Sequence, residues 1–303
     1  MRSDNESDVP GQDSDEPFGH PSDSDSEYSV EPNLAGTHVL DTWSEYGDTI
    51  SPPQEGYFRV MCCNTGPLGV NPDTDTKMEE IRNLLENHHP NVMLMQEHGV
   101  NFRFAGVKGQ WKQRLGWGEK INATTTKTIA AYNENDKVRS NFQWGGTSII
   151  SQGETTKWAA GSGKDPSGLG RWCWVRFQGT NGSFCRFVTV YRPVPHHGSQ
   201  GGEESAYKKQ KEYLQSQDDS RCPRQALLDD LGVELDKWLT EGDQILVGGD
   251  FNQDVKHDTI QSFFNDRGMS NLTFLIHDQD SAPETCSKNH QKTSIDGLFG
   301  TAS

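Results

Sequence analysis

Residues 242–254 read GDQILVGGDFNQD, and this stretch decides the fold. Its apolar run, Ile245 to Val247, ends in two glycines and predicts a short strand buried on both faces. Asp250 and Asn252 follow that strand directly, where loops of layered α/β folds carry functional side chains. The paired glycines indicate close backbone approach. They favour a functional role for Asp250 and Asn252 over the structural alternative, an Asx turn.

Three other apolar runs also end in polar side chains. Asn64 follows RVMCC (59–63), Glu97 follows VMLMQ (92–96), and Tyr191 follows RFVTV (186–190). Each has a structural alternative: Asn64 can form a turn, Glu97 can end a strand in solvent, and Tyr191 can cap a core. Two carboxylates brought together at strand ends would hold a hard cation such as Mg²⁺ through oxygen ligands and water.

The remaining patterns predict a mixed α/β domain of about 250 residues. Apolar spacing predicts helices within 73–89 and along 227–239, the second as one stripe of leucines and Trp238. Strands are predicted at 57–63, 92–95, 145–150, 171–177, 184–191 and 245–247, with 179–183 (GTNGS) closing a hairpin. Trp172 and Trp174 share one face of their strand and are interpreted as core residues.

Charge divides the chain into two parts. The net charge is −16, yet residues 1–55 carry 14 Asp or Glu against one Arg, a net of −13. This Ser- and Asp-rich segment has few apolar residues and is predicted to be a disordered tail, because it cannot bury enough surface to fold. The remaining residues carry only −3, so an acidic overall composition does not exclude a nucleic-acid partner for a domain at 56–303.

Several classes of protein are excluded by composition. No run approaches the ~20 apolar residues of a membrane span, and no signal peptide is apparent. We therefore expect a monomer without membrane contact, nuclear or cytoplasmic and not secreted. The six cysteines show no CxxC spacing, which indicates neither a zinc knuckle nor a disulfide framework.

Taken together and in this order, five segments resemble the endonuclease/exonuclease/phosphatase family over about residues 57–300: FRVMCCNTG, VMLMQEHG, FVTVYRP, GGDFNQD and SIDGLFG. The long segment from YRP to the helix, and the IDG ending, are most similar to retroelement endonuclease domains. The resemblance implies an α/β fold, a two-sheet sandwich flanked by helices, here expected to lack its last strand.

The resemblance also implies roles for individual residues. Glu97 would be the principal ligand of Mg²⁺, with Mn²⁺ as the alternative ion, and Asn64 would hold its carboxylate and reach the metal. Asp250 would orient or deprotonate the attacking water. Asn252 would bind the scissile phosphate, and Tyr191 would contact the phosphate or the leaving oxygen. Asp296 matches the acid that orients a catalytic histidine.

That histidine is where the sequence departs from the family. The family ends in a Ser-Asp-His segment, but no such tripeptide occurs here, and His98, His196, His197 and His290 stand in other contexts. We therefore expect a domain that stops before its final motif, and an inactive chain is one outcome that this expectation allows. The predicted function is Mg²⁺-dependent phosphodiester hydrolysis by a DNA-nicking endonuclease. The alternatives are a catalytically dead nucleic-acid-binding module or gene fragment, an RNA nuclease, and an inositol-phosphate phosphatase.

Two basic segments are candidates for contact with a nucleic-acid backbone. In the first, basic residues alternate with tryptophans suited to base stacking: Lys108, Trp111, Lys112, Arg114, Trp117 and Lys120. The second holds Lys208, Lys209 and Lys211, and a solvated helix face explains it equally well.

Overall fold

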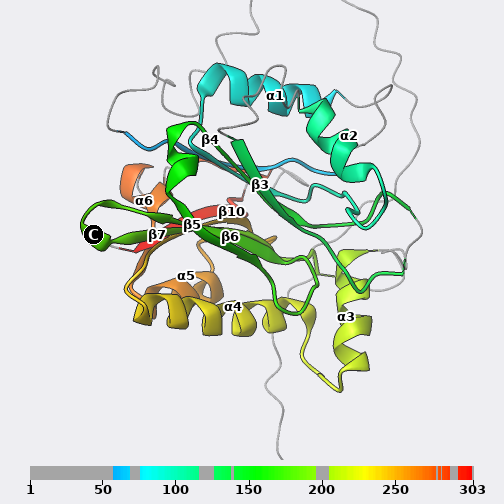
Figure 1. Ribbon diagram of the computed structural model, residues 1–303. Helices are drawn as coiled ribbons and strands as arrows, with labels where there is room; N and C mark the ends of the chain where they lie inside the picture. Colours follow the sequence, from blue (N-terminus) through cyan, green and yellow to red (C-terminus); the bar gives the residue numbers. More distant parts are fainter. Residues whose placement is uncertain are drawn as a thin grey trace, which may run out of the picture.

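The computed structural model describes residues 57–68, 76–115, 126–137, 140–195, 205–277, 279–280, 282–286 and 293–301. The predicted tail at 1–55 lies outside these residues. Two β-sheets stack face to face in the centre, with helices on both outer sides (Figure 1). The predicted two-sheet α/β sandwich flanked by helices is therefore confirmed.

The first sheet has the strand order β1-β2-β4-β3. Its strands are β1 (Val60–Asn64), β2 (Val92–Gln96), β3 (Thr126–Ala131) and β4 (Thr147–Gln152). Strands β1 and β2 run parallel, whereas β4 is antiparallel to both β2 and β3. Helices α1 (Lys77–His88) and α2 (Val107–Arg114) cover its outer face (Figure 1). Met78, Ile81 and Leu85 on α1 pack against Met93 and Met95 of β2, as the helical spacing predicted.

The second sheet has the order β5-β6-β7-β8-β10-β9. Its strands are β5 (Ala159–Lys164), β6 (Trp172–Gln178), β7 (Phe184–Tyr191), β8 (Gln244–Asp250), β9 (Met269–Asn271) and β10 (Asp296–Thr301). Strands β7 and β8 are parallel, and every other pair is antiparallel. The predicted hairpin joins β6 to β7 through the short 3-10 helix Thr180–Gly182. A second 3-10 helix, Glu154–Trp158, precedes β5.

Helices α4 (Pro223–Thr240) and α5 (Asp258–Asn265) cover the outer face of the second sheet (Figure 1). The leucine stripe of α4 packs there with Trp172 and Trp238, and Trp174 lies against the same cluster, so both strand tryptophans are core residues. Helix α3 (Ala206–Ser216) lies beside the sandwich, and α6 (Leu272–His277) connects β9 with the last segment (Figure 1). Among the described helices, none combines the length and the apolar character that a bilayer span requires.

The glycine pair before Asp250 lies where the two sheets meet. A Cβ atom at Gly248 would stand 2.8 Å from Leu94 Cδ1 and 2.9 Å from Cys62 Sγ, both in the first sheet. A Cβ atom at Gly249 would stand 2.6 Å from the Val190 carbonyl oxygen. Larger residues would push the sheets and strands apart, so the close backbone approach predicted from the sequence is confirmed.

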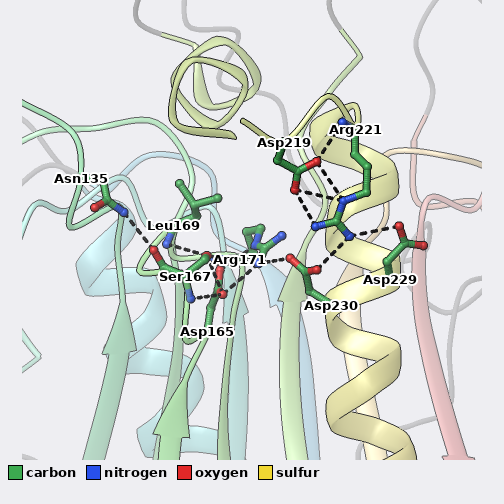
Figure 2. A network of polar contacts seen from close by, with 9 residues as sticks. All are labelled: Asn135, Asp165, Ser167, Leu169, Arg171, Asp219, Arg221, Asp229 and Asp230. Atoms are coloured by element: carbon green, nitrogen blue, oxygen red, sulfur yellow. Dashed lines mark hydrogen bonds and ion pairs between the residues drawn. The ribbon is translucent and has the colours of Figure 1, made fainter. Parts of the chain in front are cut away.

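A network of ion pairs braces helix α4 against the turn between β5 and β6 (Figure 2). The buried Arg171 guanidinium contacts Asp165 at 2.6 Å and reaches Asp230 on α4 at 2.9 Å. Arg221 contacts the same Asp230 at 3.0 Å and also Asp219 at 2.6 Å. Because a buried charge is costly without a partner, loss of Asp165 would destabilise this turn strongly.

All six cysteines are free thiols, as their spacing indicated, and only Cys173 is fully buried.

Candidate active site

Five strands bring their polar ends to one edge of the sandwich. Asn64 is the last residue of β1, Tyr191 the last of β7 and Asp250 the last of β8, while Glu97 follows β2 directly. Because β1 and β2 are parallel, and β7 and β8 are parallel, each pair ends on the same side. Tyr191 pairs with Asp250 in register, and Asp250 pairs with Asp296 at the start of the antiparallel β10.

The Asn64 amide joins the two sheets. Its Nδ2 donates to Glu97 Oε2 at 3.1 Å and to Asp250 Oδ2 at 2.7 Å. Its Oδ1 accepts a hydrogen bond from the Gly66 backbone N–H at 2.7 Å, which turns the NH₂ group toward the carboxylates. The expectation that Asn64 holds the Glu97 carboxylate therefore matches this geometry, and the amide holds Asp250 as well.

The Asp250 carboxylate is almost fully enclosed. Its Oδ1 accepts from the Asn252 backbone N–H at 2.8 Å, and its Oδ2 accepts from Asn252 Nδ2 at 3.2 Å. Burial raises the pKa of Asp250 to about 7, and the negative charges of Asp296 and Glu97 act in the same direction. Hydrogen bonds from Asn252 and Asn64 partly offset this rise, so the group stands ready to take up or release a proton near neutral pH.

Asp296 lies beside Asp250 with one carboxylate oxygen unsatisfied. Its buried Oδ1 has no hydrogen-bond partner, while its backbone N–H donates to Thr285 Oγ1 at 3.1 Å. Burial raises the pKa of Asp296, and the Glu97 charge adds to the rise. An unpartnered buried oxygen among three carboxylates is costly by itself and would be relieved by a cation.

The donor set fits a hard divalent cation. Glu97, Asp250 and Asp296 supply carboxylate oxygens, the ligands that Mg²⁺ prefers, whereas the Asn64 amide directs its NH₂ group rather than its oxygen toward them. Among the described residues, no three His, Cys, Asp or Glu side chains are placed to hold one ion together. A cation at this edge of the sandwich would therefore be bound by one or two of these side chains and would keep several of its water ligands.

The Tyr191 hydroxyl completes the hydrogen bonding of Glu97, donating to Oε1 at 3.2 Å. Burial raises the pKa of Tyr191 well above its ordinary value, as do the charges of Glu97 and Asp250, so the hydroxyl keeps its proton. The ring lies against Gly145, where a Cβ atom would stand 3.1 Å from it. Gly145 also has a φ of +86°, so a larger residue would both crowd the ring and strain the backbone.

Two of the site residues occupy the left-handed backbone region. Glu97 has a φ of 61° and Asn252 a φ of 47°. Left-handed geometry is costly for a residue with a Cβ atom and is found where surrounding contacts enforce it. At Glu97 one such contact is the backbone N–H, which donates to the Gly146 carbonyl at 2.8 Å.

His98 is a buried structural residue despite its place beside Glu97. Its Nε2 lies 3.1 Å from the Ala131 carbonyl, and its Nδ1 accepts from the Val100 N–H at 2.9 Å. Burial lowers the pKa of His98 to about 4, so the ring is neutral and both its nitrogens are occupied. His98 is therefore not placed to act as a catalytic histidine, and His196, His197 and His290 lie outside the described residues.

The structure places the two basic segments, the candidates for contact with a nucleic-acid backbone, in different surroundings. Trp111 points into the core beneath α1 and α2, so the expectation that it stacks on a base is wrong. Its spacing on α2 places it with Val107 on the face that packs inward. Trp117 and Lys120 lie outside the described residues. Lys208, Lys209 and Lys211 all belong to α3, and Lys209 lies 4.0 Å from Asp136.

Three further polar residues at the site were not singled out from the sequence. Thr285 bonds to the backbone of Asp296, and Arg224 and Gln253 hydrogen-bond around the Asn252 loop. Gln253 follows the GGDFN segment and so could have been found there. Arg224 is distant in the chain and gives no local signal.

Comparisons with known proteins identify the family and agree with the fold. The family model described as the endonuclease/exonuclease/phosphatase family matches residues 62–302. A comparison with curated protein sequences finds no match. Among solved structures, the catalytic domain of human Nocturnin with bound sulfate is 13% identical. That match covers 80% of this chain and 82% of the other, with a TM-score of 0.50.

A 3′ phosphatase from Neisseria bound to a product DNA hairpin is 14% identical, and its match covers 81% of this chain and 87% of the other, with a TM-score of 0.50. At these identities the likeness to solved structures establishes the fold alone.

Proposed function

This chain belongs to the endonuclease/exonuclease/phosphatase family, and from that premise we propose that it hydrolyses phosphodiester bonds in DNA with Mg²⁺ or Mn²⁺. The observation that carries the proposal is the Asn64 amide, which holds Glu97 and Asp250 together across the two sheets. A single edge of the sandwich thereby combines a cation ligand with a carboxylate able to act on water.

The residues divide the work as follows. Glu97 would hold the cation, which when bound supplies positive charge against the phosphate. Asn64 would add its amide oxygen only if the amide turned over and gave up its bond from the Gly66 N–H. Asp250 would orient the attacking water and take its proton, since its raised pKa makes it a better base than an exposed carboxylate. Tyr191, which remains protonated, would donate to a phosphate or leaving oxygen.

Asn252 needs a change of partner to bind the phosphate. Its Nδ2 donates to both the Arg192 carbonyl and Asp250 Oδ2. The longer bond, 3.2 Å to Asp250, is the one that a phosphate oxygen would replace. Breaking that bond leaves Asp250 with fewer donors and so raises its basicity.

The YRP and IDG segments support a DNA-nicking endonuclease of the retroelement type. The structural neighbour from Neisseria was solved with a product DNA hairpin, which is in keeping with a nucleic-acid substrate. The test is a substrate panel of supercoiled plasmid, single-stranded RNA and an inositol polyphosphate, each with Mg²⁺, Mn²⁺ or EDTA. We expect plasmid nicking that EDTA abolishes. Preference for RNA or for inositol phosphate would replace the DNA assignment, and binding of DNA without any cleavage would favour a non-catalytic module.

A further inference from the structure

Two buried arginines enclose the Asn252 loop from behind. Arg192 follows Tyr191 in the chain, and Arg224 lies in the first turn of α4; their side chains are only 5% and 7% exposed. Neither was assigned a role by the sequence motifs. Their depth argues against direct contact with a substrate, so any effect on the reaction must act through neighbouring groups.

The hydrogen bonds of Arg224 end on both loops that carry site residues. Nη1 donates to the Pro193 carbonyl at 2.8 Å, in the loop after β7. Nη2 donates to the Asn252 carbonyl at 3.2 Å and to Gln253 Oε1 at 3.3 Å, in the loop after β8. The guanidinium fork therefore fixes the distance between the two loops.

Arg192 connects the same elements from the other side. Its Nη1 donates to Gln253 Oε1 and its Nε to the Arg224 carbonyl at 3.4 Å. Its own carbonyl accepts from Asn252 Nδ2 at 2.8 Å, which fixes the side-chain amide. The backbone carbonyl of Asn252 is thus bound by the Arg224 guanidinium, and its side-chain amide is bound by the Arg192 backbone carbonyl.

These contacts act on a residue with a left-handed backbone, since Asn252 has a φ of 47°. Asparagine tolerates this region better than most residues with a Cβ atom, so the contacts determine where its side-chain amide points rather than offset a large strain. The carbonyl bond from Arg224 is one contact that supports this conformation. We propose that Arg224, together with Gln253, is a positioning residue that aims the Asn252 amide at the reacting phosphate; this deepens the proposed hydrolytic function and rests on it.

The shape of arginine matters more than its charge in this arrangement. A planar guanidinium presents several N–H donors in fixed directions and can bind three acceptors on two loops at once. A lysine ammonium keeps the charge but is a single point at the end of a flexible chain. Arg224→Lys therefore separates positioning from electrostatics.

The experiment measures kcat and KM for plasmid DNA and for bis-p-nitrophenyl phosphate in the full chain. Arg224→Lys should lower kcat by about 10- to 100-fold with KM nearly unchanged, because loss of alignment acts on the transition state. Gln253→Met removes the shared acceptor and should give a similar loss. Arg267→Lys is the matched control. Arg267 also binds two groups at once, the Phe263 backbone carbonyl and the Asp236 carboxylate. None of these three residues belongs to the site.

A double variant distinguishes a positioning role of Arg224 from a merely structural one. If Arg224 acts through Asn252, Arg224→Lys should change kcat less than about twofold when Asn252 is already alanine, because coupled residues are not additive. A full additional loss in that background would overturn the proposal, as would wild-type kcat in Arg224→Lys.

A second readout does not depend on hydrolysis. The side-chain amide resonances of Asn252 in the metal-free protein should shift or broaden in Arg224→Lys and not in Arg267→Lys. An unchanged Asn252 resonance would overturn the positioning role even in an inactive protein. If the wild type cleaves no substrate while the resonance responds as expected, the proposed function fails and the positioning of Asn252 stands.

Discussion

Asp250 and Asp296 are directly paired residues on the antiparallel strands β8 and β10. The Asp250 carboxyl is buried and the Asp296 carboxyl is partly buried. The charge of Asp296 raises the pKa of Asp250, and the charge of Glu97 raises the pKa of both groups. At neutral pH this pair of carboxylates is a local source of instability. A cation or a proton relieves it, which couples metal binding to proton release.

The first prediction concerns this pair. Replacing Asp296 by asparagine removes the charge that, after burial, contributes most to the raised pKa of Asp250. The pKa of Asp250 is 3.8 in the unfolded chain and about 7 in the folded protein. The folded protein therefore loses stability as the pH rises from about 3.8 to about 7, because the unfolded chain gives up this proton more readily. Asp296→Asn should lower the pKa of Asp250 by about one unit, equivalent to about 1.4 kcal/mol at pH 8.

Urea unfolding in EDTA at pH 4 and pH 8, together with NMR titration of the Asp250 carboxyl, checks this expectation. The variant should gain stability over wild type at pH 8 and little at pH 4. Asp266→Asn, an exposed change at the end of α5, is the control. A pH dependence identical to that of wild type would show that the two carboxylates do not interact.

The second prediction concerns Glu97. Glu97→Gln keeps the shape of the side chain but removes the charge that a hard cation requires. Mg²⁺ affinity should fall at least about tenfold, and the far-UV spectrum should not change. Titration calorimetry measures the affinity, with Glu154→Gln, at an exposed glutamate paired with Lys157, as the matched control. Equal Mg²⁺ binding by the Glu97 variant and wild type would remove Glu97 from the metal site.

The third prediction uses the neutral, buried His98. Its pKa is lowered from 6.5 to about 4, so below pH 6.5 the unfolded chain takes up a proton that the folded protein refuses. Stability is therefore lost as pH falls from about 6.5 to about 4, by about 3 kcal/mol at the lower end. His98→Gln does not titrate, so the stability gap between wild type and variant should narrow by this amount. A gap that stays constant from pH 7.5 to 4 would contradict the assignment.

The fourth prediction concerns residues 1–52. If this acidic segment only screens the domain, its deletion should leave the melting temperature nearly unchanged and strengthen nonspecific DNA binding. The gain should fade with added salt, because its origin is electrostatic. Fluorescence anisotropy at two salt concentrations and a melting curve test both parts. A fall of many degrees in melting temperature would mean that the segment packs on the domain.

The sequence predicted those elements whose apolar pattern is strong. Strands 92–96, 172–178 and 184–191 and the leucine-rich α4 were all located to within a few residues. Strand β5 was missed because its AAGSGK sequence is rich in small residues and has no β-branched side chain. Strand β3 and helix α5 were missed because they are only 6 and 8 residues long, too short for apolar spacing to distinguish them from a connecting segment.

At the site, sequence reasoning found groups at strand ends but not the groups behind them. Asn64, Glu97, Tyr191 and Asp250 each follow an apolar run and are visible for that reason. Arg224 was invisible because its partners Pro193 and Asn252 are about 30 residues away in either direction. The prediction for Trp111 was wrong because the basic residues beside it in the sequence suggested an exposed position, whereas it lies on the buried face of α2.

The register of β7 against β8 has a practical consequence for engineering. Tyr191 and Asp250 stay opposite each other because their strands are hydrogen-bonded in parallel, whatever the length of chain that connects them. A peptide inserted after Pro195 and before α3 lies outside that ladder and beyond the Arg192 and Pro193 carbonyls that bind Asn252 and Arg224, so it leaves the spacing of the two residues unaltered. The connection is therefore a suitable position for a reporter or an affinity handle, and grafting sites there would not disturb the reactive edge of the sheet.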